Sequence, residues 1–291
     1  MTSTVAESAD RTALAVRAES LGKRYRAKWA LRGCSFELPA GRVAALVGAN
    51  GAGKSTLMSV LAGLLGADEG SVRTAGRVSL VSQDKPVYRH FTAAEMLGLG
   101  AHLNVVWDQA RATDWLERFE IPLDRACGKL SGGQQAQVAF ALALGARPTV
   151  LLLDEPLANL DPLARREVTT ELLAEVERTG MTVLLSTHVV AELSGVADYL
   201  LLLAHGRLLA GGDVDDLLAR HATFVGPASE APPVPGVVVQ ARHHGAQSTF
   251  LVELPGGQPR PVVAEPWVRR PVGLEEYVLA QLAVTRKEVG A

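Results

Sequence analysis

A glycine-rich loop between an apolar run and a helical stretch constrains this chain more than any other feature. Residues 48–56 read Gly-Ala-Asn-Gly-Ala-Gly-Lys-Ser-Thr, after the apolar residues 43–47 and before a stretch with helical spacing of apolar side chains. Glycines let the backbone turn tightly, so that several N–H groups point at phosphate oxygens near the positive end of a helix. The arrangement predicts a site for a nucleoside triphosphate.

The loop also supplies side chains for this chemistry. Lys54 is placed to reach the β- and γ-phosphates, and Ser55 offers a hydroxyl to Mg²⁺. The predicted nucleotide-binding residues of the loop are Asn50, Gly51, Gly53, Lys54, Ser55 and Thr56.

Throughout the first 220 residues, short apolar runs alternate with stretches that have helical spacing of apolar side chains. This alternation predicts an α/β fold with a mainly parallel sheet. Strand-like apolar runs are expected at residues 43–47, 78–81, 150–153 and 182–186, and helices at 54–64, 134–146 and 163–179. Residues 86–130 lack strand-like runs and contain helical candidates at 93–98 and 108–119, so we expect a helical insertion there, with the helical subdomain spanning about 86–146.

Composition sets the broad class. The 291 residues are 48% hydrophobic and 21% charged, which suits a globular chain of about two domains. With 29 basic and 31 acidic residues the net charge is −2, and no nucleic-acid partner is expected. Cys34 and Cys127 are expected to be reduced thiols. No apolar run is long enough to span a membrane and no signal peptide is visible, so we expect a cytoplasmic protein unless a partner carries it to a membrane.

The composition changes after residue 221. Residues 226–227 and 231–235 are rich in Gly and Pro and read as a linker. Strand-like runs at 237–240 and 248–254 and a helical pattern at 274–284 then predict a small α+β appendage. The expected organisation is a tail over 1–13, the main domain over 14–221, a linker over 222–236 and the appendage over 237–291.

Two acids follow the apolar run at 150–153. Asp154 and Glu155 stand at the end of a buried strand, where open α/β sheets place their ligands. Asp154 is expected near Mg²⁺, and Glu155 faces the other way and is expected to polarise an attacking water. Alone, the pair also fits a strand that ends in a solvated acidic turn.

A second glycine motif precedes a helical run. Residues 130–134 read Leu-Ser-Gly-Gly-Gln, which predicts another anion site at a helix start. One nucleotide does not need two such sites, so we expect each to serve a nucleotide held by another copy. The alternative is a glycine-rich helix start with no ligand.

In this order and spacing, the motifs resemble those of the ATP-binding cassette family, the nucleotide-binding subunits of ABC transporters, over residues 17–220. Tyr25 stands where the family's aromatic residue stacks on adenine, although Trp29 is an alternative. Gln83 matches the glutamine loop and His188 the switch histidine. Four residues match the signature motif: Ser131, Gly132, Gly133 and Gln134. Asp154 matches the metal-binding aspartate and Glu155 the catalytic glutamate. Asn159–Asp161 match the loop that crosses the dimer interface. At residues 136–137, Ala-Gln replaces the family's frequent Gln-Arg pair.

The resemblance implies a P-loop ATPase domain with a mainly parallel core sheet, an antiparallel β subdomain and a helical insertion. It implies a head-to-tail homodimer or heterodimer around two MgATP, with Asp161 linking the sites. The implied catalytic residues are Lys54, Glu155 and His188, and the implied metal-binding residues are Ser55, Gln83 and Asp154.

The resemblance also implies a separate transmembrane permease that holds the chain at the inner face of the cell membrane. Val87, Tyr88 and Phe91 are candidates for that contact; local core packing is their alternative. Overall the chain is most similar to bacterial ABC-2 or drug-exporter ATPases, which favours export over import. The other classes are a cassette ATPase acting on ribosomes or DNA and a nucleotide-binding regulator without catalysis.

Overall fold

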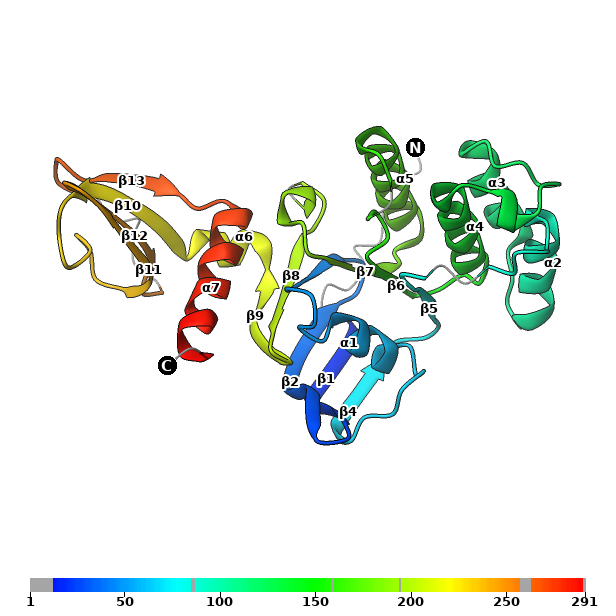
Figure 1. Ribbon diagram of the computed structural model, residues 1–291, viewed down its shortest axis with the longest axis horizontal. Coiled ribbons are helices and arrows are strands. Elements are labelled where there is room, and N and C mark those ends of the chain that lie inside the picture. The colour runs from blue at the N-terminus through cyan, green and yellow to red at the C-terminus, as the bar shows by residue number, and fades with distance from the viewer. Residues whose placement is uncertain (1–12, 85–86, 159, 194, 257–262, 290–291) are drawn as a thin grey trace, which may run out of the picture.

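The computed structural model describes residues 13–84, 87–158, 160–193, 195–256 and 263–289. The expected N-terminal tail lies outside the described residues except for residue 13, and so does Asn159. Figure 1 shows the four-stranded sheet at one end of the elongated molecule, the six-stranded sheet in the middle with the three-stranded sheet below it, and α2, α3 and α4 at the other end.

A six-stranded sheet forms the centre. Its order is β5 (Val78–Val81), β6 (Val150–Asp154), β7 (Thr182–Thr187), β3 (Val43–Val47), β8 (Tyr199–Ala204) and β9 (Arg207–Asp213). The neighbours from β5 to β8 are parallel and β9 is antiparallel to β8. β3, β6 and β7 are buried along their whole length, which explains their continuous apolar sequence. Because these three strands are parallel, their carboxyl ends lie at the same edge of the sheet.

A second, antiparallel sheet packs near the first. It has the order β2 (Lys28–Pro39), β1 (Leu14–Tyr25) and β4 (Glu69–Thr74). Helix α1 (Lys54–Leu61) shares one apolar core with this sheet and the central one, since Leu57 packs in the same cluster as Leu38 of β2 and Leu152 of β6. α1 is shorter than the expected 54–64 because the chain turns at Gly63, whose φ is 72°.

Four longer helices lie toward the opposite end of the molecule from the appendage (Figure 1). They are α2 (Ala93–Leu103), α3 (Gln109–Arg118), α4 (Gly132–Gly145) and α5 (Pro162–Thr179), with the 3₁₀ helix η1 (Cys127–Lys129). A second 3₁₀ helix, η2 (Val190–Leu193), lies on the side of the appendage, where it contacts α7. Trp107 lies against Gly100 of α2 and Gly145 of α4, where an added Cβ would come within 2.5 and 2.6 Å of its ring. The unusual Gln137 is buried and accepts a 2.9 Å hydrogen bond from Trp115 Nε1, so it ties α4 to α3.

The C-terminal region is an α+β unit joined to the main sheet. Its elements are α6 (Val214–Ala219), β10 (His221–Pro227), β11 (Val237–His244), β12 (Gln247–Glu253), β13 (Val268–Pro271) and α7 (Leu274–Val289). The antiparallel sheet has the order β11-β12-β10-β13. Tyr277 and Val278 of α7 are buried in one cluster with Leu251 of β12 and Leu200 of β8, so the helix fills the space between the two sheets (Figure 1).

The linker predicted over 222–236 is wrong for its first six residues. Residues 222–227 belong to β10, which has β12 on one side and β13 on the other. Phe224 in this strand is 0% exposed, so the segment is core and not a spacer. Gly226 and Pro227 end the strand; they do not open a linker.

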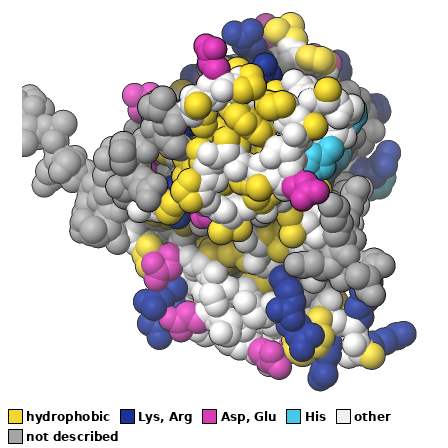
Figure 2. Space-filling model, turned by 90° about the vertical axis from the view of Figure 1, so that its left-hand side faces the viewer, with side chains coloured by type: hydrophobic (Ala, Val, Ile, Leu, Met, Phe, Trp, Pro, Cys, Tyr) yellow, Lys and Arg dark blue, Asp and Glu magenta, His cyan; other side chains and the backbone are white. Residues whose placement is uncertain are grey.

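Apolar side chains also lie on the surface of this region. Val237, Val238 and Val268 are exposed, and Figure 2 shows hydrophobic side chains gathered at this end of the molecule. Among the helices of the described residues, none combines the length and the hydropathy that crossing a bilayer requires.

Both cysteines are free and buried. Burial raises the pKa of the Cys34 and Cys127 thiols, which disfavours the reactive thiolate.

Candidate nucleotide-binding site

A cleft of about 620 Å³ opens where β3, β6 and β7 end. It brings together ten of the residues predicted from the sequence: Tyr25, Asn50, Gly51, Gly53, Lys54, Ser55, Thr56, Gln83, Glu155 and His188. They come from five separate parts of the chain, so the sheet topology assembles the site. Lys28, Trp29, Ala30 and Ala158 complete its lining.

The glycine loop takes a shape that larger residues resist. Gly51 and Gly53 have φ values of 78° and 111°. A Cβ on Gly48 would lie 2.3 Å from the Leu203 carbonyl oxygen, and one on Gly53 would lie 2.5 Å from that of Ala30. The loop therefore packs directly against neighbouring backbone.

Three charged or titratable groups meet on the floor of the cleft. Lys54 is only 6% exposed, and its Nζ donates to the Gly48 carbonyl oxygen at 2.8 Å. Nζ also lies 3.4 Å from Glu155 Oε1, while His188 Nδ1 lies 2.8 Å from Glu155 Oε2. The Glu155 carboxylate thus contacts both residues that are predicted to face the γ-phosphate.

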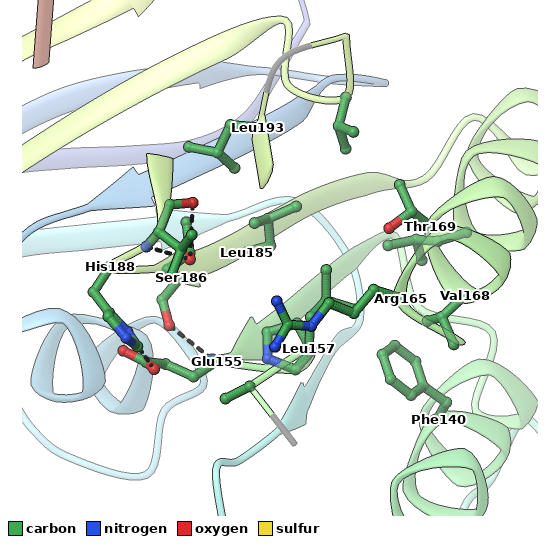
Figure 3. Close-up of a pocket in the computed structure, with 16 residues that line it drawn as sticks. Phe140, Glu155, Leu157, Arg165, Val168, Thr169, Leu185, Ser186, His188 and Leu193 are labelled. Carbon is green, nitrogen blue, oxygen red and sulfur yellow. Dashed lines mark hydrogen bonds and ion pairs between the residues drawn. The ribbon is translucent and has the colours of Figure 1, made fainter. Parts of the chain in front are cut away.

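The two acids have different hydrogen-bond partners. Asp154 ends β6, is 5% exposed, and accepts a 2.6 Å hydrogen bond from Ser186 Oγ. Glu155 follows in the left-handed region at φ 49°, which is unfavourable for a residue with a side chain. Its side chain turns toward His188 (Figure 3).

The donor set at this edge fits Mg²⁺. Ser55 and Gln83 line the cleft and supply a hydroxyl and an amide oxygen. Asp154, the last residue of β6, precedes the lining residue Glu155 in the chain but is not itself among the described lining residues. Hard oxygen donors of this kind, together with phosphate oxygens and water, are what Mg²⁺ prefers.

The two aromatic side chains at the rim of the cleft, Trp29 and Tyr25, differ in how far their rings are already covered by other residues. The Trp29 ring already has the Arg24 guanidinium 5.4 Å from its centroid and lies against Gly22. Tyr25 is 48% exposed. The open Tyr25 ring is therefore the better surface for stacking a base.

The signature residues lie apart from this cleft. Within the described part of the chain, Ser131, Gly132, Gly133 and Gln134 are not among its lining residues. Ser131 caps the start of α4, where its Oγ accepts the Gln134 amide at 3.2 Å and Gln134 Oε1 accepts the Ser131 amide at 3.1 Å. Asp161 caps α5 by accepting the amides of Leu163 and Ala164, each at 3.0 Å.

Two residues, one that lines the cleft and one behind the acid pair, were not identified from the sequence. Lys28 belongs to no motif, and only the pairing of β1 with β2 places it beside Tyr25. Ser186 appears in the sequence only as a neighbour of His188, and its contacts require the register of β6 with β7, in which Asp154 pairs with Ser186.

The sheet, the glycine loop and the acid pair together define a P-loop nucleotide-binding domain. A family model described as ABC transporter matches residues 31–158. The chain is 36% identical over 217 residues to the molybdenum import ATP-binding protein ModC of Mycobacterium tuberculosis (strain ATCC 25618 / H37Rv), a match that covers 66% of this chain and 59% of ModC.

A second relative is similar over more of the chain. The daunorubicin resistance ATP-binding protein DrrA2 of Streptomyces coeruleorubidus is 33% identical over 298 residues, covering 95% of this chain and 88% of DrrA2. Among solved structures, an ATP-binding subunit of an ABC transporter has a TM-score of 0.65 and 27% identity, over 70% of this chain and 92% of that one. The chain belongs to the ATP-binding cassette family of ABC transporters, and the fold expected from the resemblance is confirmed.

Proposed function

We propose that the chain hydrolyses ATP as the energy-supplying subunit of an ABC transporter and works as a head-to-tail dimer. The observation that carries this proposal is the contact of Glu155 with both Lys54 and His188 inside a phosphate-type cleft. A regulator without catalysis has no need to hold a carboxylate where the terminal phosphate would lie.

Positioning and charge do most of the work in phosphoryl transfer. The loop amides and Lys54 hold the β- and γ-phosphates, and the phosphate replaces Glu155 as the partner of Lys54. Glu155 then orients the attacking water and accepts its proton, and His188 contacts the γ-phosphate. Ser55, Gln83 and Asp154 would hold Mg²⁺, which supplies positive charge against the phosphate oxygens.

A dimer explains why the signature residues lie outside the cleft. Ser131 and Gly133 of one copy would cover the γ-phosphate bound to the other copy, and Asp161 would connect the two sites. A two-fold axis makes both sites equivalent if the copies are identical. A second, different cassette chain would give the same arrangement as a heterodimer.

The partner in the membrane would be a separate permease, which would hold the chain at the inner face of the cell membrane. Tyr88 and Phe91 support this contact, because they are 63% and 39% exposed with ring centroids 5.4 Å apart. Val87 differs from them, since it packs against the main core.

Export is the direction that we propose. The match to DrrA2, whose name refers to drug resistance, covers 95% of this chain and so includes most of the C-terminal unit. The match to the importer subunit ModC covers 66%. Transport assays on inside-out vesicles that carry the cognate permease would test the direction: ATP-driven uptake into them supports export, and ATP-driven efflux contradicts it.

The catalytic proposal is tested by Glu155→Gln. The amide cannot accept the proton of the water, so we expect phosphate release to fall by about 100-fold or more, within the range of general base catalysis. ATP binding, measured by equilibrium titration, should persist. Equal hydrolysis by the variant and the wild type would remove Glu155 from the mechanism, and no hydrolysis by either would contradict the function itself.

A further inference from the structure

One buried hydroxyl group contacts both acids of the site. Ser186 lies in β7 and is 0% exposed. Its Oγ donates a hydrogen bond to Asp154 Oδ1 at 2.6 Å and accepts one from the Glu155 amide at 2.9 Å. A hydroxyl can do both at once, whereas an apolar side chain can do neither.

The first hydrogen bond fixes the Asp154 carboxylate. With Oδ1 held by Ser186, the rotation of the carboxylate is restricted and the other oxygen keeps its lone pairs for a cation or a water that a cation holds. Groups that orient metal-binding residues in this way affect metal affinity without touching the metal.

The second hydrogen bond acts on the backbone of Glu155. This residue has a left-handed φ of 49°, a conformation that the surrounding structure must stabilise. The Ser186 oxygen accepts its amide from the neighbouring strand (Figure 3), and that turn directs the carboxylate toward Lys54 and His188. Without the acceptor, a partly buried amide would lose its partner.

We propose that Ser186 is a positioning residue that sets the metal-binding aspartate and the catalytic glutamate relative to each other through one hydroxyl group. This inference rests on the proposed ATPase function, because it assigns roles within the same site. Ser186 itself touches neither nucleotide nor water in the reaction, so its effect passes through Asp154 and Glu155.

The test compares Ser186→Thr with Ser186→Val. The two side chains have nearly the same shape and impose the same crowding in β7, but only threonine keeps the hydroxyl. Ser186→Ala removes the hydroxyl without adding bulk. Ser248→Ala is the matched control, because Ser248 is also a buried strand serine whose Oγ accepts an amide (Ser229 N, 2.9 Å) and donates to a carbonyl oxygen (Ser229 O, 3.1 Å), far from the cleft in β12.

Two readouts do not depend on turnover. Amide hydrogen exchange of the peptide containing Glu155, measured without nucleotide, should speed up in the Ala and Val variants and stay slow in the Thr variant. Mn²⁺ binding to the ATP complex, measured by electron paramagnetic resonance in a Glu155→Gln background, should weaken by about tenfold or more in the same two variants. ATP binding in EDTA should stay within about threefold of wild type, since Lys54 and the loop amides do not contact Ser186.

Activity adds a third readout. In the Glu155-containing protein, kcat should fall by about tenfold or more for Ala and Val, be largely kept by Thr, and be unchanged by Ser248→Ala. The inference is overturned if the Val variant matches the Thr variant in exchange and Mn²⁺ binding, or if the Ala variant matches the wild type in both. A wild-type protein that hydrolyses no ATP would instead contradict the proposed function, and the exchange and Mn²⁺ comparisons would still decide the role of Ser186.

Discussion

Two glycine-rich helix starts in this chain look alike in sequence but differ in how their amides are satisfied. α1 begins after Gly53 with no side-chain cap among the described residues, and its start faces the cleft. α4 begins with Ser131 and Gln134 in a reciprocal capping box, on an exposed part of the surface. Each start carries the positive end of a helix dipole.

This difference in capping indicates that the phosphate site at the start of α1 is complete within one chain, whereas the site at the start of α4 is not. The uncapped α1 start leaves backbone donors that a bound phosphate satisfies. The α4 start is already stabilised by its own side chains, so it needs no ligand for folding. We infer that α1 binds nucleotide in the single chain and that α4 meets phosphate only when a second copy closes.

The largest change in nucleotide affinity should come from Lys54→Ala. This substitution removes the buried ammonium group that lies 3.4 Å from Glu155 in the cleft at the start of α1. We expect the Kd for ATP to rise by about 10- to 100-fold, as for loss of a charge-assisted hydrogen bond. Titration of the single chain with a fluorescent ATP analogue measures it. Lys23→Ala is the control, because Lys23 is a partly buried lysine that also pairs with an acid, Asp68. Unchanged affinity would mean that the α1 start is not the phosphate site.

Substitution at the start of α4 should have a smaller effect, and it should change folding stability and turnover, not nucleotide affinity. Ser131→Ala removes its capping box, and Thr92→Ala removes the equivalent box from α2, where Thr92 and Glu95 make the same pair of contacts. Both variants should lose about 1 kcal/mol of folding stability in urea titrations.

Only the α4 variant should affect catalysis. We expect Ser131→Ala to lower ATP turnover by about tenfold while the Kd of the single chain for ATP stays the same, because its hydroxyl acts on the partner's nucleotide. Thr92→Ala should keep normal turnover. Equal losses of turnover in the two variants would reduce the role of Ser131 to helix stability.

The smallest change in ATP affinity is expected from substitutions at the rim of the cleft. Tyr25→Ala removes the open ring and should weaken ATP binding by a few-fold to tenfold, the lower range for stacking on a base. Trp29→Ala should weaken it less, because that ring is already engaged by Arg24. Parallel titrations with ATP and with inorganic triphosphate separate stacking from phosphate binding. A larger loss for Trp29→Ala with ATP alone would reverse the assignment.

Four of the six strands of the central sheet could be predicted from the sequence, because β3, β6 and β7 are buried along their whole length and β5 is at least partly buried. The strands β8 and β9 at the other side of this sheet were not predicted. β3 and β5 have the predicted bounds, and β6 and β7 differ from prediction only by one final residue. Continuous apolar runs bounded by Gly, Pro or acids leave few alternatives in such a fold.

Other features depend on tertiary contacts that no local pattern records. β10 was missed because Gly226-Pro227 resembles the opening of a linker, while the strand is stabilised by neighbours 20 to 50 residues further on. The motif residues predicted the cleft, but the left-handed backbone of Glu155 and its hydrogen bond to Ser186 arise from the register of β6 and β7.

The association state of the Glu155→Gln variant tests the account most directly. Sedimentation velocity should show a single chain without nucleotide and a dimer with MgATP, because blocked hydrolysis keeps the phosphate that both helix starts contact. Adding Ser131→Arg, which places a bulky charged group at the α4 start, should return the protein to the single-chain state although ATP still binds. A MgATP-loaded Glu155→Gln protein that stays a single chain at high concentration, both alone and with its membrane partner, would contradict the shared site.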